Sequence, residues 1–284
     1  MQSPRSQGTM TPKQSRNVDA QGATNISFFD TFINLVIEPY SATVNPNYID
    51  IVRDALLHPE RFESQKSAGR GNIYLFPLEE HQGIVREYRR GGLIGLILKK
   101  HYFLDNRPIR ELEVWCHAYE YDVPVPVPLG VMWQVHWPFV SGTIATQYFP
   151  SKHLQEFLES KPQADKRKSA LLKTGKAIRK MHAAEIVHAD LQVRNILVEP
   201  TGVVSLIDFD NSKIVYGIRD RARHRNLLRL KRSFEKNDLD PNDFNTICEG
   251  YGIDSLPKGL SLLYQIKGKI SSALAGSKSD TDLT

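Results

Sequence analysis

The chain has 284 residues, 40% of them hydrophobic and 24% charged, a balance that excludes a chain disordered throughout. The net charge of +5 suits acidic partners such as nucleotides, phosphorylated substrates or an anionic membrane surface, and equally suits plain solubility. Only two cysteines are present and they form no CxxC pair, so we expect a reducing cytoplasm. No apolar run reaches the roughly 20 residues of a membrane-spanning helix, so any membrane contact is expected at the surface.

The first half of the chain is expected to be rich in strands. Before the first of them, the segment Pro46–Leu57 is predicted as a helix capped by Asn45, because proline suits the first helical turn. The β-branched and aromatic residues of Asn72–Pro77 predict a strand. Its hairpin partner is predicted at His81–Tyr88, with Gln82-Gly83 near the turn.

Helical spacing predicts a helix over Arg110–Asp122, with Leu112, Trp115, Cys116 and Tyr119 on one face. Three prolines that follow, at positions 124, 126 and 128, are expected to end it. Further strands are expected at 131–139, 143–148, 196–198 and 203–207, and further helices at 151–158 and 170–183.

This order of strands followed by helices predicts an α+β fold with two lobes and a hinge near Gln147–Lys152. We expect a disordered tail at 1–25, an N-lobe with the nucleotide-binding elements at 26–148, a helical C-lobe with the catalytic loop at 149–275, and a flexible tail at 276–284.

The segment that carries chemistry runs from His182 to Ser212, HAAEIVHADLQVRNILVEPTGVVSLIDFDNS. Phosphoryl transfer needs one carboxylate near the attacking hydroxyl and oxygen ligands for magnesium. Asp190 is predicted as the catalytic carboxylate, with Asn195 and Asp208 as Mg²⁺ ligands. A hairpin between the two aspartates would fold the second back beside the first.

Each of these residues taken singly is more often a cap or turn residue, and only their combination is specific. For His188 a structural role that braces the loop is favoured. For Asp210 a second metal ligand and a loop brace both stay open.

The pattern HxDxxxxN followed by Asp-Phe-Asp resembles the protein-kinase signature. It departs from that signature at Ala189, where many protein kinases have Arg, and at Asp210, where DFG has Gly. No APE-like segment follows. These departures favour a small-molecule or glycolipid substrate over a protein.

The upstream half should supply a phosphate-binding loop and a cation. The candidate loop is Ser67–Asn72, in which Gly69, Arg70 and Gly71 are the expected nucleotide-binding residues. Glycines there allow backbone to approach phosphate, although most such loops are turns. Ile84-Val85-Arg86 resembles the VAIK strand with Arg86 in place of Lys. Glu111 is the expected ion-pair partner of Arg86, with Glu113 as the second choice and a plain surface charge as the alternative for either.

Three further stretches are similar to the 3-deoxy-D-manno-octulosonic acid (Kdo) kinase family. They are Gly69–Gly71, Arg86–Leu93 (REYRRGGL) and Asn226–Lys236 (NLLRLKRSFEK), and HADLQVRNILV and LIDFD fit the same family. The resemblance implies a protein-kinase-like fold, ATP and Mg²⁺ as cofactors, and phosphorylation of a Kdo hydroxyl on a Kdo–lipid A glycolipid acceptor. It also implies lipopolysaccharide inner-core biosynthesis at the cytoplasmic face of the bacterial inner membrane.

Two basic segments agree with an anionic partner. Arg89 and Arg90 beside two glycines could form an anion-binding turn, and seven cations lie between Arg219 and Arg232, interleaved with leucines. The alternative for the second segment is a helix with a solvated basic face and a leucine stripe in the core. Because no set of stacking aromatics accompanies the charges, no nucleic-acid partner is expected.

Two other functions stay open. One is a phosphotransferase for a soluble acceptor, of the aminoglycoside or choline kinase-like type. Activity on a lipid-linked acceptor would distinguish a Kdo-type kinase from it. The other is a nucleotide-binding pseudokinase, suggested by the missing VAIK lysine and opposed by the presence of Asp190, Asn195 and Asp208.

Overall fold

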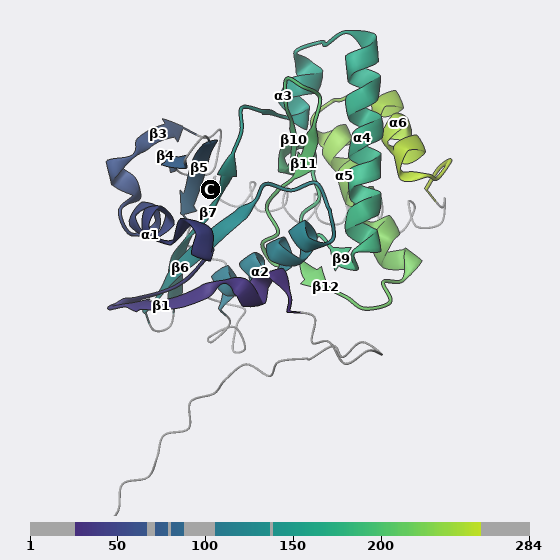
Figure 1. Ribbon diagram of the computed structural model, residues 1–284. Coiled ribbons are helices and arrows are strands. Elements are labelled where there is room, and N and C mark those ends of the chain that lie inside the picture. Colours follow the sequence, from purple (N-terminus) through teal and green to yellow (C-terminus); the bar gives the residue numbers. More distant parts are fainter. Residues whose placement is uncertain (1–25, 67–71, 79–80, 88–105, 137–138, 257–284) are drawn as a thin grey trace, which may run out of the picture.

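The computed structural model describes residues 26–66, 72–78, 81–87, 106–136 and 139–256. Within these residues, the first half of the chain forms an antiparallel seven-stranded sheet in the order β1-β2-β6-β7-β5-β4-β3 (Figure 1). Its strands are β1 (Ile33–Ile37), β2 (Tyr40–Val44), β3 (Glu63–Lys66), β4 (Asn72–Leu78), β5 (His81–Glu87), β6 (Pro128–His136) and β7 (Phe139–Tyr148).

Two helices pack on the sheet with separate cores. Helix α1 (Ile49–Leu57) buries Val52 and Leu56 in one core, together with Phe76 and Val85 of the sheet. The 3₁₀ turns Phe28–Thr31, Pro46–Tyr48 and Pro59–Arg61 lie before and after it in the chain. Asn45 does cap this segment by accepting from the Asn47 N–H at 3.0 Å, but the first turn is 3₁₀ and α1 begins only at Ile49.

Helix α2 (Arg107–Glu120) links the sheet to the helical part of the molecule. Its Leu112 and Trp115 share a core with residues of β6 and β7 and with residues of the later helices. At its far end the His117 ring donates from Nε2 to the Ala184 carbonyl at 2.9 Å. Because α2 contacts both the sheet and the helical part, its side chains can reach the loops that carry the predicted catalytic residues.

The second half of the chain is mainly helical, with a small three-stranded and a two-stranded antiparallel sheet that carry the catalytic segment (Figure 1). Its helices are α3 (Leu154–Glu159), α4 (Ala164–Ala183), the 3₁₀ turn Val193–Asn195, α5 (Asp220–Lys236) and α6 (Pro241–Tyr251). Its strands are β8 (Lys152–His153), β9 (Ile186–Val187), β10 (Ile196–Val198), β11 (Val204–Leu206) and β12 (Lys213–Ile214). The predicted α+β class is confirmed.

Gln82 and Gly83 lie inside β5, directly after His81, which pairs with Leu78 beside the hairpin turn, so their predicted place near the turn is confirmed. Gly83 pairs with Phe76 of β4, and a Cβ added at Gly83 would lie 2.1 Å from the Phe76 ring. The glycine also makes room for a buried aromatic ring, a tertiary requirement that the local sequence did not show.

Several predicted boundaries also shift because backbone pairing decides them. β6 starts at Pro128, which pairs with Thr146, and β7 starts at residue 139 instead of 143. The helix predicted from residue 151 begins only at Leu154, because Lys152 and His153 pair with β10. The helix predicted from residue 170 begins at Ala164.

On α2, the predicted face is buried at Leu112, Trp115 and Cys116, whereas Tyr119 is exposed. Across the described part of the chain, no helix combines the length and the apolar character that a bilayer crossing requires. Both predicted tails, residues 67–71 of the candidate loop with Gly69, Arg70 and Gly71, and Arg89 and Arg90 lie outside the described residues. The predicted lobe limits stay predictions.

Candidate active site

The loop between β9 and β10 is built around a buried histidine. His188 is fully buried, and its Nε2 donates to the Ile207 carbonyl at 3.1 Å while its Nδ1 accepts the Asp190 N–H at 3.1 Å. An imidazole that donates at one nitrogen and accepts at the other is neutral. Burial accordingly lowers the pKa of His188. The bracing role predicted for His188 is confirmed, since it holds the backbone of Asp190 against the strand before Asp208.

A residue from α5 fixes the other side of this loop. The Asn226 side chain accepts the His188 N–H at 3.0 Å and donates to the His188 carbonyl at 2.7 Å. It also accepts from Nε2 of His182 at 3.1 Å, and the Tyr251 hydroxyl donates to Nδ1 of His182 at 2.8 Å. Burial is the largest of the effects that lower the pKa of His182, to about 4. Sequence reasoning missed Asn226, for which the only signal was a polar residue next to buried leucines.

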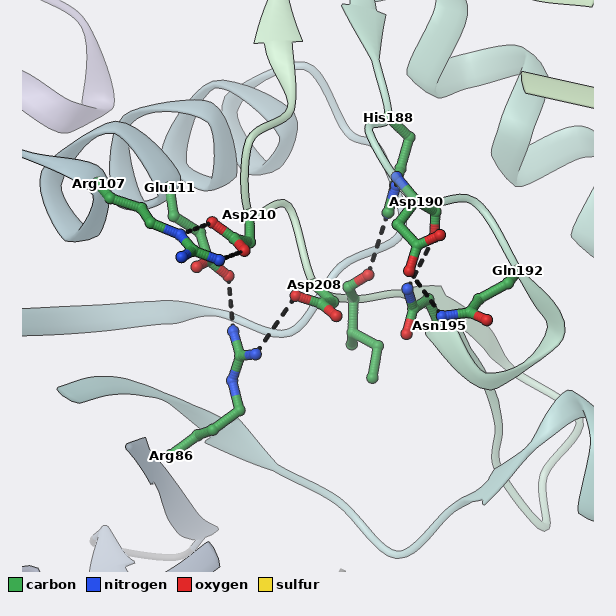
Figure 2. Close-up of polar contacts among 10 residues, drawn as sticks. Arg86, Arg107, Glu111, His188, Asp190, Gln192, Asn195, Asp208 and Asp210 are labelled. Carbon is green, nitrogen blue, oxygen red and sulfur yellow. Dashed lines mark hydrogen bonds and ion pairs between the residues drawn. The ribbon is translucent and has the colours of Figure 1, made fainter. Parts of the chain in front are cut away.

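Asp190 itself is exposed and held from two directions (Figure 2). Gln192 donates from Nε2 to its carboxylate at 2.7 Å, and Asn195 donates from Nδ2 to its backbone carbonyl at 2.8 Å. Asn195 is only 2% exposed. Because its amide nitrogen is used in this way, the carbonyl oxygen of Asn195 is the atom suited to a cation.

The Asp208-Phe209-Asp210 segment is positioned by its central ring. Phe209 is fully buried, with ring centroids 5.5 Å from Trp115 of α2 and 5.2 Å from His188. Asp208 has a φ of 67°, in the left-handed region that non-glycine residues seldom adopt and that concentrates at functional sites. The packed ring fixes the segment, and the Asp208 carboxylate lies beside Arg86.

Arg86 of β5 joins this carboxylate to α2. Its guanidinium lies 2.7 Å from Oε1 of Glu111 and 3.3 Å from Oδ1 of Asp208 (Figure 2). Glu111 is 1% exposed, and a carboxylate that deep requires a positive partner. The ion pair expected between Arg86 and Glu111 is present, whereas Glu113 is exposed on another face of α2.

A second ion pair connects α2 to the same segment. Arg107, four residues before Glu111 and so on the same helical face, engages both carboxylate oxygens of Asp210 (Figure 2). The sequence left two roles open for Asp210, a loop brace and a second metal ligand. The ion pair with Arg107 is a contact of the bracing kind. Sequence reasoning did not single out Arg107, because nothing in its local pattern distinguishes it from a surface arginine at a helix start.

The donor set fits magnesium. Among the described residues no three His, Cys, Asp or Glu side chains group as a metal cage, but Asn195 and Asp208 offer amide and carboxylate oxygens. Mg²⁺ in nucleotide sites takes few protein ligands and completes its shell with phosphate oxygens and water. The arrangement can therefore hold a magnesium–nucleotide complex beside Asp190. The roles assigned to these residues remain predictions.

Comparison with known proteins agrees with this chemistry. Residues 60–251 match the sequence profile described as the lipopolysaccharide kinase (Kdo/WaaP) family. The chain is 33% identical over 220 residues to the 3-deoxy-D-manno-octulosonic acid kinase of Vibrio cholerae serotype O1, covering 71% of this chain and 91% of that protein. It is 28% identical over 212 residues to the protein of the same name from Vibrio vulnificus, covering 69% and 88%. With the protein of that name from Xylella fastidiosa strain M12, the identity is 27% over 181 residues, covering 62% and 71%.

Proposed function

Because the chain belongs to the lipopolysaccharide kinase (Kdo/WaaP) family, we propose that it transfers the γ-phosphoryl group of ATP to a hydroxyl of the Kdo residue on a Kdo–lipid A precursor. The reaction would belong to lipopolysaccharide inner-core biosynthesis. The observation that carries the proposal is the convergence of Asp190, Asn195 and Asp208 from one braced segment, with Arg86 held beside them by Glu111. That family has a protein-kinase-like fold, as the sequence predicted.

Asp190 would orient the acceptor hydroxyl and receive its proton. It is exposed, and its backbone is held by His188 and Asn195, so the carboxylate projects from a rigid loop toward an incoming sugar. Holding the hydroxyl in line with the transferred phosphoryl group, together with neutralisation of charge, accounts for most of the rate gain in such reactions.

Asn195 and Asp208 would hold Mg²⁺, which when bound supplies positive charge against the nucleotide phosphates. Arg86 would add two N–H donors in a fork, where most protein kinases present a lysine. Its contact with Glu111 keeps the guanidinium directed at the same region as the Asp208 carboxylate.

We also propose that the protein works as a peripheral protein at the cytoplasmic face of the inner membrane, where its acceptor would lie. Exposed arginines on α5, such as Arg221 and Arg225, support an electrostatic contact with anionic lipid. The leucines that follow them on the helix, Leu227, Leu228 and Leu230, are buried in the core. Membrane contact through α5 would therefore rest on charge and would not involve inserting these leucines.

The test is incubation of the purified protein with γ-labelled ATP, Mg²⁺ and a Kdo-bearing lipid A precursor, followed by mild acid release of the sugar. Label that leaves with the released sugar supports the proposal. The matched control acceptor is the same precursor without Kdo, which should take up no label. Magnesium-dependent transfer to soluble acceptors alone would contradict the glycolipid assignment and favour the aminoglycoside or choline kinase-like reading. ATP binding without any transfer would favour a pseudokinase.

A further inference from the structure

An open pocket of about 680 Å³ lies beside Asp190. This volume is within the range of small-molecule pockets, about 300–1,000 Å³. Its described lining comes from two sources, the catalytic loop and the end of α5. The lining residues are Asp190, Gln192, Arg194, Arg229, Arg232, Ser233, Glu235, Lys236 and Asn237.

The α5 side of the pocket is one face of the helix. Arg229, Arg232, Ser233 and Lys236 follow the spacing i, i+3, i+4 and i+7, which places them along one stripe. The buried Ser233 hydroxyl accepts the Val193 N–H at 3.1 Å. This bond fixes the helical face at a set distance from the loop that carries Asp190.

Charge in the pocket is strongly biased. Two arginines and one lysine on α5 join Arg194 of the loop, against the carboxylates Asp190 and Glu235. Arg229 is close enough to the loop that its charge adds weakly to the effect of burial in lowering the pKa of His188. A neutral alcohol would not need such surroundings, so the cations indicate an acceptor that carries an oxyanion of its own.

The pocket is separate from the predicted nucleotide side. Arg86, Glu111 and Asp208 do not contribute to its described lining, and Asp190 is shared between it and the catalytic segment. In the view of Figure 2, Gln192 extends from the loop away from Arg86. In-line transfer requires the acceptor to approach the γ-phosphoryl group from the side opposite the leaving group, so an acceptor pocket should include Asp190 and leave out the nucleotide-binding residues, as this lining does.

We propose that this pocket is the acceptor subsite, and that Arg232 and Lys236, supported by Arg229 and Arg194, bind an oxyanion of the acceptor sugar. The proposal rests on the proposed function and adds to it the residues that select an anionic acceptor. Arginine forks bind carboxylate and phosphate through two parallel N–H donors. Anchoring the oxyanion there would present a neighbouring hydroxyl to Asp190.

The experiment measures the KM for Kdo–lipid A precursor in Arg232→Gln, Lys236→Gln and the double variant. Loss of a charge-assisted hydrogen bond is expected to raise this KM by about 10-fold or more for each residue, with the KM for ATP unchanged. Lys231→Gln is the matched control, because it removes the same charge one residue away from a side chain outside the pocket lining. Its exposed pairing with Glu235 at 3.9 Å contributes little, so its KM should stay within about twofold of the wild-type value.

A second arm identifies the oxyanion. The same variants are assayed with precursor whose lipid A phosphates have been removed, and with precursor whose Kdo carboxyl has been reduced to an alcohol. A variant effect that disappears only with the reduced sugar assigns the carboxylate, and one that disappears only with the dephosphorylated lipid assigns the phosphates. Either result supports the subsite.

Wild-type KM values in the double variant would overturn the subsite while leaving the proposed function intact. Failure of the wild type to label any Kdo acceptor would instead overturn the proposed function. In that case, binding of free Kdo and of its carboxyl-reduced form, measured by ligand-observed NMR, decides the subsite. Binding of free Kdo that the double variant abolishes would retain the anion pocket, and equal binding of both sugars, or none, would overturn it.

Discussion

Arg86 and Asp208 are 122 residues apart in the sequence, and their side chains meet at 3.3 Å between Nη1 and Oδ1. The same guanidinium holds the buried carboxylate of Glu111 at 2.7 Å. One cation thus links a strand of the sheet, helix α2 and the segment after β11. Any change in the Arg86 side chain should therefore alter both nucleotide binding and the packing of α2.

We expect Arg86→Lys to raise the KM for ATP by about 10-fold, because an ammonium cannot reproduce the two-pronged fork between Glu111 and Asp208. Arg86→Met should in addition lower the free energy of unfolding by about 1–3 kcal/mol, since it leaves Glu111 buried beside an apolar side chain. Steady-state kinetics and urea unfolding measure the two effects. Arg53→Met is the control, because Arg53 pairs with Asp50 on the surface and should cost under about 1 kcal/mol. Equal losses in the two methionine variants would refute this account.

Asp190→Asn should reduce kcat by about 10²- to 10⁴-fold with little change in the KM for ATP, because it removes the proton acceptor and keeps the shape of the side chain. Gln192→Ala removes only the 2.7 Å hydrogen bond to the carboxylate and should have a much smaller effect. Both are measured with the labelled-ATP transfer assay. Wild-type turnover in Asp190→Asn would end the proposed mechanism.

Asp208→Asn should raise the Mg²⁺ concentration required for half-maximal activity by about 10-fold or more, because an amide replaces a charged metal ligand. Asp210→Asn should shift the same titration less if Asp210 chiefly braces Arg107. A magnesium titration of both variants measures the difference. An unchanged midpoint in Asp208→Asn argues against its metal role, and an equal shift in both variants makes Asp210 a second ligand.

Stability should fall in acid through His182. Its pKa is lowered from 6.5 to about 4 in the folded protein, so between those values the unfolded chain binds the proton more readily. The contribution of neutral His182 is complete above about pH 6.5 and is lost as the pH falls toward 4, a span worth on the order of 3 kcal/mol. His188 acts in the same direction.

Urea unfolding from pH 4 to 7 measures this dependence. His182→Gln, which keeps a polar side chain facing Asn226 and Tyr251, should flatten the stability profile in that window. His224→Gln is a poorer comparison because His224 lies near His182, so His58→Gln, directly after α1, is the control and should keep the wild-type slope. A wild-type slope in His182→Gln would show that other groups carry the acid sensitivity.

Gly175→Ala should destabilise the protein by about 1–3 kcal/mol or more, because an added Cβ would lie 2.1 Å from the Ile247 carbonyl oxygen of α6. Intrinsic helix propensity predicts the opposite sign, since Ala is favoured over Gly by about 1 kcal/mol in a helix. The sign of the measured change in unfolding free energy therefore decides between the two effects. Ser169→Ala, at an exposed position of the same helix, should change it by less than about 0.5 kcal/mol.

The sequence by itself determined the elements and residues whose causes are local. The strand–turn–strand segment that carries Asp190, Asn195 and Asp208 follows from apolar runs and turn residues within about thirty positions, and the Asn45 cap follows from its own neighbours. The sequence also predicted Glu111 as the partner of Arg86, because the strand of Arg86 resembles the VAIK strand of protein kinases and Glu111 lies on the helix that follows it.

Only the tertiary structure decided the contacts that join distant segments. Arg107 meets Asp210, and Asn226 joins His182 to His188, although no periodicity in the chain relates these positions. Gly83 leaves room for the Phe76 ring of the neighbouring strand, a role that its position near the hairpin turn did not show. Hydrophobic spacing and turn residues indicate the local backbone conformation. Burial of a charge or a ring depends instead on which distant segment packs against it.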